Sequence, residues 1–187
     1  MRTALLILAV MAGLKTGAQA EPSKPLHPKY PVIEGNYRMT ADWALTLDQK
    51  YNRRIEDGSL VIWRPGFTIW TKVWGSKEGE TPEQTLKGLK DGISPKATEV
   101  KEEKEGGVLR VSYRLEEESE DKRKPAFHGF AVGPDSHVQI SIYFNDEKEA
   151  AKAVQIFKSL TPVDAKKAGG KTPAPTAPAA PEKPVPK

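Results

Sequence analysis

The chain has 187 residues, 29% of them charged, a formal net charge of +4 and no cysteine. Without cysteine, the protein has no disulfide, no lipid-modified cysteine, no thiolate metal ligand and no cysteine nucleophile. The excess of positive charge lies in residues 1–20 and after residue 160, so residues 21–160 are close to neutral. The basic composition therefore gives no reason to expect a nucleic-acid partner.

The first 20 residues have the three parts of a secretory signal peptide. Arg2 stands near the start, an apolar run extends from Ala4 to Leu14, and small residues precede Glu21. The apolar run is about 11 residues long, against the roughly 20 that a membrane-spanning helix needs. We therefore expect residues 1–20 to be a signal peptide and the mature protein to be periplasmic or secreted, without a transmembrane segment.

Composition divides the remaining chain into three parts. Residues 21–36 contain several prolines and are interpreted as an extended N-terminal arm. Residues 162–187 are dominated by Pro, Ala and Lys, which predicts a disordered tail with polyproline II character. This tail acts either as a spacer that tethers the protein or as an inert end. Residues 37–161 form a single domain that is long enough for a sizeable core.

Alternation of apolar and polar residues predicts strands in the first half of this domain. Residues 37–47 alternate strictly, which indicates a first strand with one buried face. Residues 48–57 are mostly polar and are interpreted as a connection that ends in an Asp-Gly turn. Two strands follow, at residues 59–64 and 67–74, joined by a Pro-Gly turn.

The strand at residues 67–74 carries large apolar side chains on both faces. Phe67, Ile69 and Val73 share one face, and Trp70 and Trp74 share the other. Such a strand is either covered on both sides or presents aromatic rings to another molecule.

A helix is predicted after residue 81. Thr81 can cap its first turn, Pro82 suits the first helical position, and Gln84 completes a capping box. Leu residues then recur at helical spacing until Gly92 ends the helix. We expect a short helix that packs on the sheet.

In the second half of the domain, strands followed by a helix are again predicted. Residues 97–104 and 108–116 are predicted to pair as a hairpin. We expect its second strand to direct Leu109, Val111, Tyr113 and Leu115 inward, and Arg110, Ser112 and Arg114 outward. Strands at residues 126–132 and 137–144 follow, and a helix begins at Asp146.

These elements predict an α+β fold. We expect a single antiparallel β-sheet of about 6–7 strands with two helices packed on it.

Motifs for most cofactor and metal chemistry are missing from the sequence. The three histidines lack zinc-binding spacing, the acidic residues lack the calcium-loop pattern, and no glycine-rich phosphate loop is present. We therefore expect neither a metal nor a cofactor. His128 and His137 fall on consecutive predicted strands and could lie opposite each other as a shared polar site. The alternative is that they are unrelated residues on an outer face.

The strongest candidate for a ligand or partner surface combines aromatic and basic residues. Its members are Trp63, Trp70, Trp74, Arg53, Arg54, Arg64 and Lys72. Exposed tryptophans flanked by cations suit a sugar, an anionic group or a protein partner. The alternative is that the tryptophans belong to the core and the arginine stems pack over them.

The order of elements resembles that of the PsbP-like group of small α+β accessory domains. The similarity covers residues 37–160, from the tryptophan-bearing first strand to a terminal helix that ends Ile156-Phe157-Lys158-Ser159-Leu160. Residues 53–66 are also similar to segments of exported bacterial proteins without an assigned role. The resemblance implies an accessory or binding role and assigns no site residue.

We therefore expect a non-catalytic binding or accessory module of the cell envelope, whose partner is an envelope protein or a glycan. One alternative is a hydrolase with an unrecognised site that involves His128 or His137. Another is an inhibitor or immunity-type protein that acts by protein–protein contact.

Overall fold

The structure, a computed structural model, describes residues 25–117 and 124–163. The predicted signal peptide, and the predicted tail after residue 163, lie outside these residues. Strands make up 53% of the described residues and helices 17%, so the protein is mostly β and the predicted α+β class is wrong. Among the described residues, no helix is both long and apolar enough to span a bilayer.

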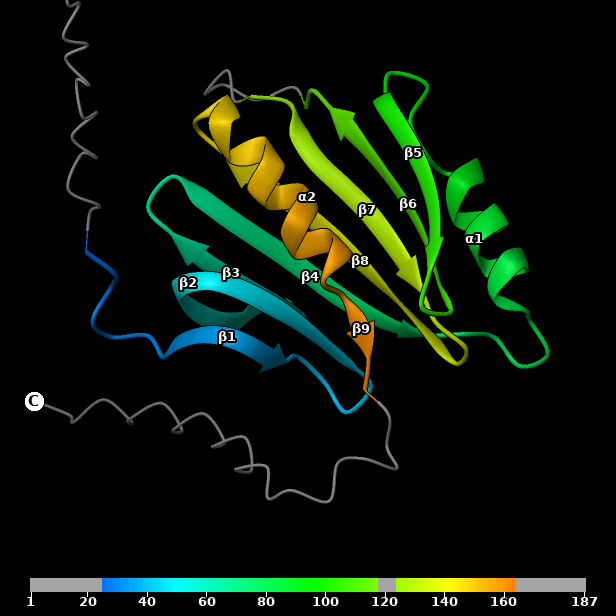
Figure 1. Cartoon of the computed structure of the whole chain (residues 1–187), viewed down its shortest axis with the longest axis horizontal. Helices are drawn as coiled ribbons and strands as arrows, with labels where there is room; N and C mark the ends of the chain where they lie inside the picture. Colours follow the sequence, from blue (N-terminus) through cyan, green and yellow to red (C-terminus); the bar gives the residue numbers. More distant parts are fainter. Residues whose placement is uncertain (1–24, 118–123, 164–187) are drawn as a thin grey trace, which may run out of the picture.

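The chain forms two meanders of four strands, each followed by a helix (Figure 1). The first comprises β1 (Val32–Arg38), β2 (Trp43–Glu56), β3 (Ser59–Arg64) and β4 (Phe67–Gly75), followed by α1 (Pro82–Asp91). The second comprises β5 (Thr98–Glu105), β6 (Val108–Leu115), β7 (Ala126–Val132) and β8 (Ser136–Phe144), followed by the 3₁₀ turn η1 (Glu147–Glu149), α2 (Ala150–Lys158) and the short strand β9 (Thr161–Pro162).

All nine strands belong to one antiparallel sheet with the order β1-β2-β3-β4-β8-β7-β6-β5. β4 and β8 pair along their whole length, from Phe67 opposite Phe144 to Gly75 opposite Ser136. This pairing joins the two meanders at the centre of the sheet. β9 pairs with the start of β2.

The predicted fold class is wrong because the sheet has nine strands, more than the 6–7 that were expected. The predicted strand at residues 37–47 is divided between β1 and β2, because a tight turn separates them. Arg38 stabilises this turn by donating hydrogen bonds from its guanidinium to the carbonyl oxygens of Thr40 and Ala41, at 3.1 and 2.8 Å. Residues 48–56, predicted as a connection, continue β2. Their polar side chains are compatible with a strand because many of them face water.

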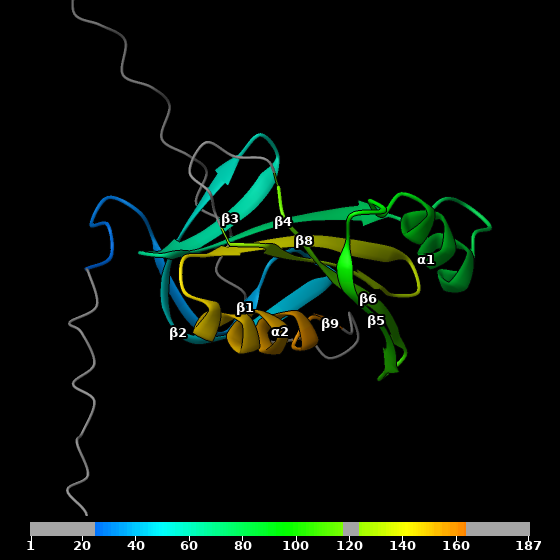
Figure 2. The same cartoon turned by 90° about the horizontal axis from the view of Figure 1, so that it is seen from above.

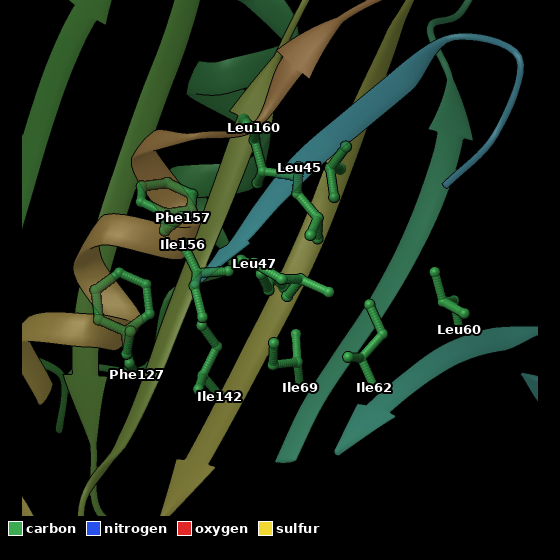
Figure 3. Packing of buried hydrophobic residues seen from close by; sticks show 14 of the residues in the cluster. Leu45, Leu47, Leu60, Ile62, Ile69, Phe127, Ile142, Ile156, Phe157 and Leu160 are labelled. Carbon is green, nitrogen blue, oxygen red and sulfur yellow. The ribbon is translucent and has the colours of Figure 1, made fainter. Parts of the chain in front are cut away.

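The core lies between α2 and one face of the sheet. β2 pairs with β9 and β1 through its first half and with β3 through its second half, so the sheet bends around α2 (Figures 1 and 2). Figure 3 shows Ile156 and Phe157 of α2 among Leu45 and Leu47 of β2 and Ile142 of β8. All five residues are at most 4% exposed, so this interface excludes water and supplies most of the apolar burial.

α1 covers only one end of the opposite face. Its residues Leu86 and Leu89 pack with Leu109 and Val111 of β6 and with Val132 of β7 in a second, smaller cluster. Figure 2 shows α1 at the end of the sheet, with α2 on the other side of the strands. No described helix covers β3, β4 and β8 on this face.

β6 is buried on both faces, which the sequence did not predict. Arg110 and Arg114, expected to point outward, are 3% and 7% exposed and lie on the face that α2 covers. Their burial is tolerated because protein acceptors replace water. Arg110 donates to the Leu160 carbonyl oxygen at 2.7 Å, and Arg114 donates to the Pro125 carbonyl oxygen at 2.6 Å and to Glu147 at 2.7 Å.

The contact between β7 and α2 can be tested at Gly129. A Cβ atom at this position would lie 2.6 Å from Cε2 of Phe157, inside the core. We expect Gly129→Ala to lower the free energy of unfolding by about 1–3 kcal/mol, because the buried ring or the strand must shift to accommodate the methyl group. Urea unfolding followed by circular dichroism measures the change.

Gly88 supplies the matched control. It lies on α1, and a Cβ atom there meets no atom within 4 Å. Gly88→Ala should raise stability by up to about 1 kcal/mol, because alanine favours the helix. Unchanged stability in Gly129→Ala would contradict the packing of Phe157 described above.

Candidate functional site

Side chains on the face opposite α2 form regular rows across the strands. The central row consists of Val61, Trp70, Ser141, His128 and Tyr113, each opposite the next on the neighbouring strand. Because side chains alternate between the two faces of a strand, the residues two positions along each strand lie on this same face.

Neighbouring rows extend this surface over β3, β4 and β8. Trp63 lies opposite Thr68, which lies opposite Tyr143. On the other side of the central row, Lys72 lies opposite Gln139. We use the name open face for the surface formed by Trp63, Thr68, Trp70, Lys72, Trp74, Gln139, Ser141 and Tyr143. Aromatic rings alternate on it with groups that can donate or accept hydrogen bonds.

Four of the seven predicted site residues belong to the open face, and a fifth borders it. Trp63, Trp70, Lys72 and Trp74 lie on it. Arg54 borders it, with its guanidinium carbon 4.7 Å from the Trp63 ring centre.

The other two arginines lie elsewhere, so the structure does not bring the predicted set together. Arg64 forms a 2.7 Å ion pair with Glu149 and lies over the Phe67 ring, on the α2 side of the sheet. Arg53 lies 6.0 Å from the ring centre of Tyr37.

The three tryptophans of the open face differ in how much ring they offer to a ligand. Trp63 is covered by Arg54 and by the edge of Tyr30, whose ring centre is 4.9 Å away. Trp74 is 45% exposed, and the Lys72 ammonium lies 4.4 Å from its ring centre. Trp70 is half-buried and lies between Val61 and Ser141. Trp70 and Trp74 are therefore the rings most available for contact.

Tyr30 is held over Trp63 by a buried asparagine. Asn52 accepts a hydrogen bond from the His27 backbone N–H at 2.7 Å and donates to the carbonyl oxygens of His27 and Tyr30 at 3.0 and 3.1 Å. Asn52 is fully buried, so these bonds fix the segment before β1 against the sheet. The segment that contains His27 and Tyr30 therefore covers the open face at Trp63.

A polar cluster centred on His128 borders the open face toward β6. Nδ1 of His128 lies 2.9 Å from the Ser141 hydroxyl oxygen, and Nε2 lies 3.4 Å from a Glu117 carboxylate oxygen. The ring stacks on Tyr113 with 5.3 Å between ring centres. The Tyr143 hydroxyl donates to Glu117 at 3.1 Å. Burial lowers the pKa of His128, and the nearby Glu117 carboxylate opposes this shift.

The hypothesis that His128 and His137 lie opposite each other as a shared polar site is wrong. The turn between β7 and β8 places His137 opposite Val132, whereas His128 lies opposite Ser141. The register therefore separates the two rings along the strands. Among the residues that the structure describes, no group of three or more His, Asp or Glu side chains is arranged to hold a metal ion.

Ser141, His128 and Glu117 have the residue types of a hydrolytic triad, but the described backbone beside Ser141 supplies no free donor for an oxyanion hole. Stabilising the tetrahedral intermediate requires backbone or side-chain donors aimed at the developing oxyanion. Ser141 lies in the middle of β8, between β4 and β7, where backbone N–H groups belong to the sheet ladders. The arrangement fits a polar cluster that fixes the position of side chains.

Sequence reasoning missed the contributions of Ser141, Tyr143 and Gln139. Alternation along the predicted strand at residues 137–144 already implies that the neighbours of the apolar Ile140 and Ile142 share the opposite face. The missing information was the pairing of β8 with β4, because these strands are distant in the sequence. That pairing places Ser141 beside Trp70.

No protein-family model matches this chain, and no curated protein matches it in sequence. The resemblance to PsbP-like domains therefore stays a prediction.

The buried state of His128 predicts a pH dependence of stability. Its pKa lies below the ordinary value of 6.5, so the unfolded chain takes up the proton before the folded protein does. The free energy of unfolding should therefore fall as the pH is lowered from about 7 to about 5. His137 adds a change of the same sign, because burial lowers its pKa too.

We expect His128→Gln to lose less stability over this interval than the unaltered protein, because one of the two shifted groups is removed. Urea midpoints measured at both pH values test this, with His137→Gln as the comparison. An equal loss in His128→Gln and in the unaltered protein would show that His128 does not bind its proton differently in the two states.

Proposed function

We propose that this protein is a non-catalytic binding module of the cell envelope that holds an extended polysaccharide on its open face. The observation that carries the proposal is the position of Trp70 and Trp74 on a part of the sheet that no described helix covers. Buried tryptophan is the usual case, so one exposed and one half-buried ring on the same strand call for an explanation.

The spacing of the two rings suits a long ligand. Trp70 and Trp74 are four residues apart on β4, which corresponds to about 13 Å along a strand. An extended chain can contact both rings at once. Sugar rings present C–H groups on their faces and hydroxyl groups at their edges, so they match aromatic rings interleaved with hydrogen-bonding side chains. Thr68, Lys72 and Gln139 supply such side chains around the two tryptophans.

The charge of the open face favours a polysaccharide that carries carboxylates. Among the described residues Lys72 has no carboxylate partner, and its ammonium lies over Trp74. A uronic acid at this point would gain an ion pair as well as a stacking contact. Signal-like residues 1–20 support the proposal, because export would bring the protein to the polysaccharides of the envelope.

The two other functions fit the site less well. A hydrolase centred on Ser141 and His128 would need oxyanion donors, and the backbone around Ser141 belongs to sheet ladders. An inhibitor would be expected to present an apolar centre with few charges. The open face instead interleaves Trp70 and Trp74 with Thr68 and Lys72.

Binding should depend on Trp74. We expect Trp74→Ala to weaken the affinity for a soluble uronate polymer about tenfold, or about 1.4 kcal/mol, because one stacking contact is lost. Isothermal titration calorimetry with the mature protein measures the affinity. Ile55→Ala is the matched control, since Ile55 is an apolar side chain, 65% exposed, at the tip of the β2–β3 hairpin away from the open face.

A neutral β-glucan of similar length separates the contributions of stacking and charge. Lys72→Ala should weaken binding of the uronate polymer and leave the affinity for the glucan within about twofold. Equal affinities for Trp74→Ala and Ile55→Ala would place the ligand elsewhere on the protein. Absence of binding to both polymers would refute the polysaccharide proposal.

A further inference from the structure

A groove lies on the other side of the sheet, between α2 and the β5–β6 hairpin. Its volume is about 200 Å³. Ala150, Ala151, Val154 and Phe157 of α2 form an apolar wall. Ser112 and two arginines of β6 lie along the floor, and side chains of β5 form the opposite wall. The open face plays no part in this groove, because the two lie on opposite faces of the sheet.

The groove has an excess of positive charge. Four cations and two carboxylates line it: Lys101, Arg110, Arg114, Lys158, Glu99 and Glu103. Arg114 is neutralised by Glu147 at 2.7 Å, and Lys158 by Glu103 at 2.8 Å. Among the described residues, Lys101 and Arg110 have no carboxylate partner. A positive potential therefore remains where the apolar wall meets β5 and β6.

Arg110 is the unusual member of this set because it is buried and forms no ion pair with a described residue, although Glu103 lies opposite it on β5. It is 3% exposed, and its guanidinium donates to the carbonyl oxygens of Lys158 and Leu160 at 3.3 and 2.7 Å. Its Nε–H group has no acceptor among the described residues. Burial lowers the pKa of Arg110, although Glu105 and Glu103 oppose the shift. A buried charge of this kind is stabilised by any anion that approaches it.

We propose that this groove binds a small amphipathic carboxylate, a ligand with a short alkyl body and one negative group. The alkyl body packs against Ala151 and Val154 of α2, and the carboxylate lies between Lys101 and the buried charge of Arg110. The groove combines the two features that such a ligand needs, an apolar wall on α2 and cationic groups on β5 and β6. A neutral or cationic chain of the same length would leave the charge of Arg110 unbalanced.

Octanoate is the probe that tests this site. Calorimetric titration of the mature protein with octanoate, octan-1-ol and octylamine compares one alkyl body with three head groups. We expect saturable binding of octanoate, at least about tenfold weaker binding of octanol, and no binding of octylamine. Octanol or octylamine binding as tightly as octanoate would overturn the proposal, as would failure of octanoate to saturate at millimolar concentration.

Two variants locate the site without removing Arg110, which also holds the end of α2. Lys101→Glu reverses an exposed charge on the groove wall, and we expect it to weaken octanoate binding about tenfold. Lys87→Glu makes the same change in net charge on an exposed face of α1 and should leave binding unchanged. Ala151→Trp should fill the groove and abolish binding.

Thermal unfolding by circular dichroism confirms that each variant is folded before its affinity is compared. Equal effects of Lys101→Glu and Lys87→Glu would show a response to overall charge and would overturn the site. Unchanged octanoate binding in folded Ala151→Trp would place the ligand outside this groove.

Discussion

The fold depends on the packing of α2 against one face of the sheet. Phe157 fits against β7 only because position 129 is glycine, and the apolar side chains of α2 meet β2, β7 and β8 at once. Three sheet arginines fix the helical segment at both ends. Arg64 and Arg114 bind Glu149 and Glu147 before α2, and Arg110 binds carbonyl groups after it. Glu147 and Glu149 suit the N-terminal end of the helical segment, where N–H donors lack partners, and Arg110 suits the C-terminal end, where carbonyl acceptors lack partners.

This one-sided packing explains where binding surfaces can exist. A sheet strand has two faces, and α2 together with the bend of β2 covers one of them. α1 is short and covers only the β6 and β7 end of the other. The aromatic residues of β3 and β4 therefore remain accessible on the open face, although their sequence pattern is equally typical of a core. On the covered face, Arg110 holds the end of α2 and also gives positive charge to the groove beside it, so an interaction that stabilises the fold contributes to the proposed second site.

Local sequence patterns predicted those elements whose boundaries are set by local chemistry. The capping box at Thr81 and Gln84 forms as expected, and the turn between β3 and β4 lies at the Pro-Gly pair. Two features could not be predicted in this way. The polar part of β2 is a strand because of its partners β1 and β3, not because of its composition. Likewise, Arg110 is buried because the distant end of α2 supplies its acceptors. Both depend on contacts with other segments of the chain, which alternation within one strand does not encode.

The proposed polysaccharide would contact the protein at Trp70 and Trp74. The most direct measurement is the indole N–H spectrum of ¹⁵N-labelled mature protein during titration with a uronate polymer. We predict shifts of the Trp70 and Trp74 signals and an unshifted Trp43 signal, because Trp43 is 1% exposed and donates its indole N–H to Ser136 at 2.8 Å. Saturable binding that leaves the Trp70 and Trp74 signals unchanged would contradict the account.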